Sequence, residues 1–161
     1  TSVAMGNGGV LPMARSLLIA KVPLEQENVL AIDTDKEAKE SADSYGRLLS
    51  ERFGDPGKGK ELDVALLCMG REGELAESAG QGKETWAGHA QLDAGAVVSL
   101  SSTVLNRAFA VLLMAEGYEA GRGLAKILYP DGKRGKKSRS WLDPSNRFVL
   151  FLDREARQGL G

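Results

Sequence analysis

Residues 61–80 constrain the fold of this chain more than any other segment does. An acidic residue pair leads into the apolar run 64–69, whose length and composition predict a buried strand. Gly70 and Gly73 then provide a turn, and helical spacing begins within residues 72–79. A strand, a glycine turn and a helix N-terminus in succession are typical of an open α/β sheet. In such sheets ligands bind beyond the carboxyl ends of the strands.

Composition limits the classes of protein that this chain can belong to. With 161 residues it has the size of one domain, residues 1–161, with a core of its own. The net charge of -1 provides no overall field that would attract nucleic acid or a membrane. The longest apolar runs, 64–69 and 109–115, are far shorter than the roughly 20 residues of a transmembrane helix.

The single cysteine and the single histidine narrow the chemistry further. One cysteine cannot form an internal disulfide, which favours a reducing, intracellular location: the cytoplasm, or an organelle interior after removal of a targeting segment. We expect Cys68 to be an inert thiol buried in the strand. One histidine, His89, excludes a multi-histidine metal site, and the sequence has no CxxC spacing.

Apolar spacing and capping residues predict the order of the secondary-structure elements. Helices are expected at 11–22, from Asp33 or Thr34 to 53, at 103–116 after a cap at Ser101 or Ser102, at 119–128, and after a cap at Asp153. Strands are expected at 28–32, 62–69, 96–100 and 147–152, with 62–69 in the centre, and residues 79–95 are expected to form a loop. This alternation predicts an α/β fold with a mainly parallel open sheet and helices on both faces.

Five segments, taken in order, resemble the motifs of one known superfamily. They are Gly6-Asn7 with Met13-Ala14-Arg15, Glu27-Asn28-Val29 to Asp33, Leu62-Asp63-Val64 with Gly70 and Gly73, Val98-Ser99-Leu100-Ser101 with Asn106, and Phe148 to Asp153 with Ala156. The superfamily is that of 6-phosphogluconolactonase and glucosamine-6-phosphate isomerase. The lactonase branch is the more similar one, because the closing segment and the spacing of the second helix match it.

This resemblance implies an enzyme that hydrolyses 6-phosphogluconolactone to 6-phosphogluconate in the pentose phosphate pathway, without a metal or cofactor. The first strands of the family, including its glycine-rich phosphate loop, have no counterpart in residues 1–161. A sheet that lacks those strands would expose an edge or need another chain to cover it.

The catalytic motif departs from the pattern of the family. Lactone hydrolysis needs a base that activates water and donors for the oxyanion. The resemblance assigns the acid–base role to an aspartate and a histidine, and Glu72 and Glu74 stand at those positions. With Glu77 they form an acidic segment that would repel a phosphorylated substrate. Glu74 would act as a base if burial raised its pKa. Alternatively, these acidic residues stabilise the first turn of a helix through its dipole.

Other positions keep or lose substrate contacts of the family. The resemblance implies that Asn7, Gly70, Gly73 and Asn106 contact substrate, although Asn7 also suits a turn and Asn106 also suits a structural role in a helix. Val97 replaces an arginine that the family uses for phosphate. His89 matches no motif position; beside Trp86 in a glycine-rich stretch it indicates a surface residue or, alternatively, a relocated base.

A basic segment is the second candidate site. It places five cations within seven residues and is followed by an aromatic side chain: Lys133, Arg134, Lys136, Lys137, Arg139 and Trp141. Such a segment indicates either a solvated loop or contact with RNA, an anionic surface or an acidic protein.

Two functions therefore remain open at this stage. The altered motif favours a degenerate, non-catalytic relative of the lactonases that serves as a scaffold or accessory subunit bound to other protein chains. The alternative is an active 6-phosphogluconolactonase that binds the sugar phosphate.

Overall fold

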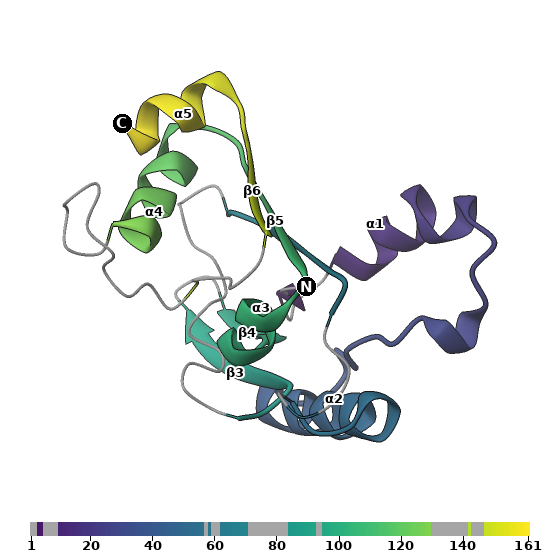
Figure 1. The fold of residues 1–161 in the computed structure, drawn as a ribbon. Helices are drawn as coiled ribbons and strands as arrows, with labels where there is room; N and C mark the ends of the chain where they lie inside the picture. The colour runs from purple at the N-terminus through teal and green to yellow at the C-terminus, as the bar shows by residue number, and fades with distance from the viewer. Residues whose placement is uncertain are drawn as a thin grey trace.

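The computed structural model describes residues 3–4, 10–56, 58, 62–70, 84–92, 95–129, 142 and 147–161. All structural statements below concern these residues. The helical elements are α1 (Val10–Leu17), the 3-10 turns η1 (Ile19–Lys21) and η2 (Gln26–Asn28), α2 (Ala38–Phe53), α3 (Ser102–Arg107), α4 (Tyr118–Leu128) and α5 (Arg154–Leu160). The strands are β1 (Val3–Ala4), β2 (Val64–Cys68), β3 (Ala87–Leu92), β4 (Gly95–Leu100), β5 (Ala110–Ala115) and β6 (Arg147–Leu152) (Figure 1).

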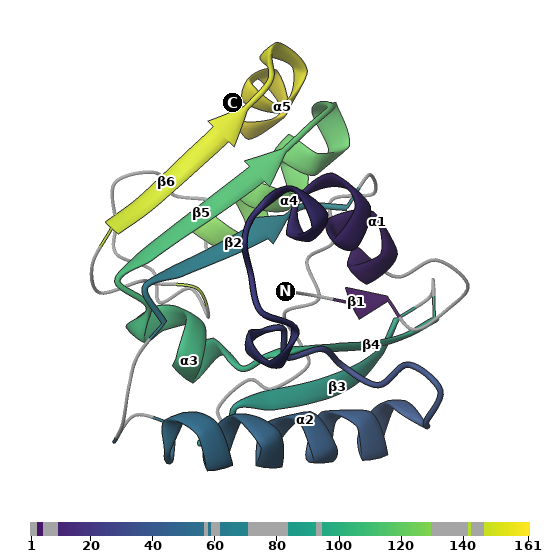
Figure 2. The same cartoon turned by 90° about the vertical axis from the view of Figure 1, so that its right-hand side faces the viewer.

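Two small sheets organise these elements. A parallel sheet has the strand order β2-β5-β6, with Val64 opposite Ala110 and Ala110 opposite Arg147. An antiparallel sheet has the order β1-β4-β3 and lies next to α2 (Figure 2). The predicted α/β class, with a parallel sheet flanked by helices, is confirmed. The antiparallel sheet is a feature that the sequence did not indicate.

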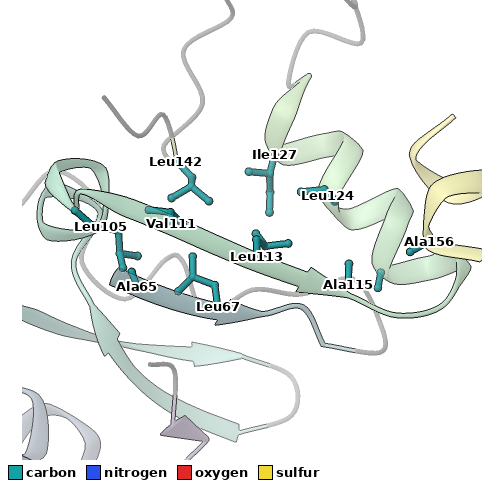
Figure 3. Packing of buried hydrophobic residues seen from close by; sticks show 12 residues of the cluster. Ala65, Leu67, Leu105, Val111, Leu113, Ala115, Leu124, Ile127, Leu142 and Ala156 are labelled. Carbon is teal, nitrogen blue, oxygen red and sulfur yellow. The ribbon is translucent and has the colours of Figure 1, made fainter. Parts of the chain in front are cut away.

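The main core lies between the parallel sheet and α4. Val111 and Leu113 of β5 are fully buried; in Figure 3 Leu113 lies next to Ile127 and Leu124 of α4, and Val111 lies next to Leu142. Alternation along β2 places Ala65 and Leu67 in the same core. Because successive side chains of a strand point to opposite faces, every second residue of β2 and β5 contributes to this cluster.

Two glycines allow α4 and α5 to pack in close contact. A Cβ atom at Gly121 of α4 would lie 2.0 Å from the carbonyl oxygen of Ala156, and one at Gly159 of α5 would lie 2.0 Å from that of Tyr118. Both distances are far below van der Waals contact. The two helices therefore meet backbone to backbone at these positions, and any larger side chain would push them apart.

The C-terminus of α2 is fixed by Trp86. Gly54, with φ of 84°, ends the helix as the glycine there predicted. The indole Nε1 of Trp86 donates a hydrogen bond to the Gly54 carbonyl oxygen at 2.8 Å, and the Trp86 ring packs on Phe53 with centroids 5.8 Å apart. Trp86 is 3% exposed, so it belongs to the core that joins α2 to β3.

The helix predicted at 103–116 is wrong beyond Arg107. Ser101 caps α3 as predicted, its side chain accepting from the backbone N–H of Val104, but the following apolar run forms the strand β5. A continuous apolar run does not distinguish a buried strand from a buried helix by its periodicity. Pairing with β2 on one side and β6 on the other makes residues 110–115 a strand. β5, rather than the predicted segment 62–69, is the central strand of the described parallel sheet.

Three further predictions are corrected. Residues 87–92, expected in a loop, form β3, because pairing with β4 overrides the weak strand propensity of Gly88 and His89. Residues 29–32 form no strand; the Ser41 and Tyr45 side chains of α2 donate instead to carbonyls of this segment and its neighbour Asp33. The predicted cap at Asp33 or Thr34 is wrong, because α2 begins at Ala38, while the helices predicted at 119–128 and after Asp153 are confirmed.

The contact between α4 and α5 generates a stability prediction. Gly121→Ala should lower the free energy of unfolding by about 1–3 kcal/mol, because its methyl group overlaps the Ala156 carbonyl. The matched control is Gly46→Ala in α2, where the nearest atom would be 3.9 Å away; it should stabilise the protein by roughly 0.5–1 kcal/mol. Urea unfolding followed by circular dichroism measures both, and equal effects would contradict the close packing.

Candidate functional site

The parallel strands β2, β5 and β6 all end at one edge of the sheet. Because they run in the same direction, the residues that follow them, Gly70, Gly117 and Asp153, lie along this edge (Figure 2). The ladder continues past β2, since the backbone N–H of Met69 donates to the Met114 carbonyl at 2.8 Å. The helices α4 and α5 begin directly after β5 and β6. This edge is where an α/β sheet places its ligand site.

Asp153 holds the two helix N-termini at this edge together. Its carboxylate accepts from the backbone N–H of Ala156 at 2.7 Å, as the predicted cap of α5, and from that of Gly117 at 3.1 Å. Gly117 has φ of 89° and precedes α4. The link to Gly117 was not predicted, because the sequence did not place residue 117 at the end of a strand. Asp153 thus has a structural role between α4 and α5.

Two of the predicted substrate-binding residues are described, and the structure separates them. Gly70 is half-buried at the edge where β2 ends. Asn106 is on α3, which precedes β5 and lies at the opposite end of the parallel strands (Figure 2). Asn106 is partly buried and has an interaction partner, in keeping with a structural role. The structure therefore does not bring Gly70 and Asn106 into one site.

The remaining predicted site residues lie outside the described residues. They are Asn7, Glu72, Gly73, Glu74, Lys133, Arg134, Lys136, Lys137, Arg139 and Trp141. Their roles stay predictions from the sequence.

Val97 and His89 lie on neighbouring strands of the antiparallel sheet. Val97 of β4 is 7% exposed and pairs with Ala90, so its side chain is part of the apolar interior. His89 of β3 is exposed and opposite Val98. His89 is thus a surface residue on a strand, rather than in the predicted loop.

Cys68 corrects the expectation of a buried thiol. Its side chain is exposed, as are those of Val64 and Leu66 in the same strand, whereas Ala65 and Leu67 are buried. The sequence of β2 is apolar throughout, so it contains no signal that could have told the two faces apart.

Two side chains with shifted pKa values lie on or near α2, and so does a cleft. None of them is at the edge where the parallel strands end. Burial raises the pKa of Tyr45, and the hydrogen bond from the backbone N–H of Asp35 lowers the pKa of Asp33, with Lys36 contributing. A cleft of about 770 Å³ runs along α2 beside Glu84 and Trp86. It has an exposed, mainly acidic rim and no contact with Gly70 or Asp153, so we do not assign it to the chemistry of the edge.

The described part of the chain has no feature typical of a metal centre or of a membrane span. Within the described ranges, histidine, cysteine and carboxylate side chains do not form a group of three or more that could hold a metal ion. No described helix has the length and hydropathy needed to cross a membrane.

A parallel sheet flanked by helices, with two helix N-termini at its carboxyl edge, defines a protein of the α/β class. Residues 10–147 match the family model described as glucosamine-6-phosphate isomerases/6-phosphogluconolactonase, and the chain belongs to this family. The resemblance in sequence is thereby confirmed. A sequence search of curated proteins finds no match.

Solved lactonases share this fold at low sequence identity. The 6-phosphogluconolactonase of Thermotoga maritima is 17% identical, with a TM-score of 0.71 over 94% of this chain and 69% of its own. The enzyme of Trypanosoma cruzi is 18% identical, with a TM-score of 0.74 over 99% and 70%. That of Leishmania guyanensis is 19% identical, with a TM-score of 0.74 over 99% and 73%.

The double role of Asp153 is testable. Asp153→Ala should lower the free energy of unfolding by about 1–2 kcal/mol, because the N–H groups of Ala156 and Gly117 lose their shared acceptor. Asp153→Asn keeps an acceptor oxygen and should lose much less. Thermal unfolding by calorimetry compares them, and an alanine variant as stable as the asparagine variant would contradict the role.

Proposed function

We propose that this chain is a non-catalytic member of the 6-phosphogluconolactonase family that serves as an accessory subunit of a larger assembly. The observation that carries the proposal is Glu74, which stands at the motif position of the histidine, with Glu72 at that of the aspartate. Family membership and fold are common to active and inactive relatives, so the replaced residues are what favours the inactive alternative.

The chemistry of a carboxylate at this position argues against ordinary turnover. A histidine of pKa about 6.5 is poised near neutral pH to take a proton from water, whereas a glutamate of pKa about 4.3 is a much weaker base. Three glutamates within six residues, Glu72, Glu74 and Glu77, also repel the phosphate group of the substrate.

Val97 supports the same conclusion from the described part of the chain. The family uses an arginine at this position for phosphate, and here an uncharged side chain packs in the apolar interior of β4. Loss of the base and loss of a phosphate-binding cation together remove both binding and chemistry. Two replacements support an inactive chain more strongly than either replacement alone.

A coupled assay with 6-phosphogluconolactone tests the proposal. The lactonase of Trypanosoma cruzi serves as the positive control, with 6-phosphogluconate formation followed by its oxidation. We expect this chain to leave the rate at that of spontaneous hydrolysis. Turnover well above that rate, if Glu74→Gln abolishes it, would contradict the proposal. It would show that the chain is an active 6-phosphogluconolactonase.

A binding measurement separates an inactive site from an absent one. Titration calorimetry with the product, 6-phosphogluconate, should show no saturable heat at millimolar concentrations. The glutamates Glu72, Glu74 and Glu77 repel the phosphate group, and the uncharged Val97 stands where the resemblance places an arginine. Saturable binding by the wild-type chain would show that a sugar phosphate site persists and would contradict a purely structural role.

A further inference from the structure

One face of the parallel sheet carries a row of exposed apolar side chains. β2 contributes Val64 at 55% and Leu66 at 51% exposure together with Cys68, β5 contributes Met114 at 46%, and β6 contributes Phe151 at 53%. In the ladder Leu66 is opposite Leu112, and Cys68 is opposite Met114, which is itself opposite Phe151. We call the five exposed side chains the open face.

The open face differs sharply from the opposite side of the same strands. There Leu67, Val111 and Leu113 are at most 3% exposed beneath α4. Parallel sheets are found almost always with both faces covered, since their strands are apolar on both sides. A contiguous patch of large apolar side chains at half exposure is a candidate contact surface for another protein.

The size of the open face matches one helix. Strands of five or six residues are about 17–20 Å long, and three of them span about 10 Å between the outer axes. An α-helix has a diameter of about 10–12 Å. α4, with 11 residues, covers the opposite face in this way.

The first helix of the chain offers a second exposed apolar surface on the same side. In Figures 1 and 2, α1 lies on the side of the sheet away from α4, and its principal contacts are with η1 and β1. Leu17, at its last position, is 69% exposed, and the adjacent Leu18 is 61% exposed. These leucines are not covered by the sheet of their own chain.

We propose that a second copy of this chain covers the open face, with α1 of each copy packed on the open face of the other. In a two-fold dimer both copies contribute the same surface. In this chain α1 and the open face lie on the same side of the parallel sheet, so one such surface contains both. The five side chains of the open face are uncharged, so a partner packed on them buries no unpaired charge from this face.

The apolar area supports a contact that includes both the open face and α1. Five half-exposed apolar side chains supply on the order of 400 Å², about half of the roughly 800 Å² per partner of a stable interface, so the leucines of α1 are needed as well. This proposal goes beyond the proposed function and holds whether or not the chain is catalytic.

Sedimentation velocity over about 1–100 µM protein tests the dimer. The wild-type chain should be dimeric at the upper end of the range, and Leu66→Lys should weaken association about tenfold or more, because it places a charge at the centre of the interface. Leu48→Lys is the matched control, because Leu48 is 38% exposed on α2, away from the open face. This variant should dimerise with the same affinity as the wild-type chain. Circular dichroism confirms folding, and Met114→Lys replaces Leu66→Lys if that variant misfolds.

The single cysteine provides a second, independent measurement. Cys68 is on the open face, so its reaction with a thiol reagent should slow as the protein concentration rises, and should stay fast in Leu66→Lys. A wild-type chain that is monomeric at 100 µM overturns the proposal, even if it binds some other protein. A dimer insensitive to both Leu66→Lys and Met114→Lys also overturns it. Leu17→Lys should weaken the dimer too, and an unchanged dimer overturns the role of α1.

Discussion

The packing of β5 between β2, β6 and α4 is the interaction on which the rest of the structure depends. β5 pairs with both neighbours in parallel register, and its fully buried residues Val111 and Leu113 join the covered face to α4. The direction of β5 also determines where α4 begins, and the parallel β6 brings α5 to the same edge. The glycine contacts at Gly121 and Gly159 then fix the two helices against each other.

The carboxyl edge of the parallel sheet lies where an α/β fold places its ligand site. Gly70 follows β2, and Asp153 ties the starts of α4 and α5 together at this edge. The proposed loss of catalysis rests on the replacements inferred at Glu74 and at Val97, which is packed in the apolar interior of β4. A fold maintained by packing survives such replacements, because the residues that hold the edge together are not those that would perform hydrolysis.

Local chemistry explains which elements could be predicted. The caps at Ser101 and Asp153, the helical spacing of α2 and the glycine after Phe53 each act within a few residues, and each was predicted. β3 and β5 were missed because their conformation depends on partners distant in sequence: β3 is a strand through pairing with β4, and β5 through pairing with β2 and β6. Of the candidate site, the position of Gly70 at a strand end was predictable, whereas the distance of Asn106 from it was not.

The sequence by itself determined the family, through an ordered series of motifs. It also indicated the caps at Ser101 and Asp153, because a cap needs only a side chain and a nearby N–H group. The tertiary structure decided which side of β2 is buried. In an apolar run every residue suits either face, and the position of α4 selected Ala65 and Leu67 for the core. Val64, Leu66 and Cys68 were left on the open face for the same reason.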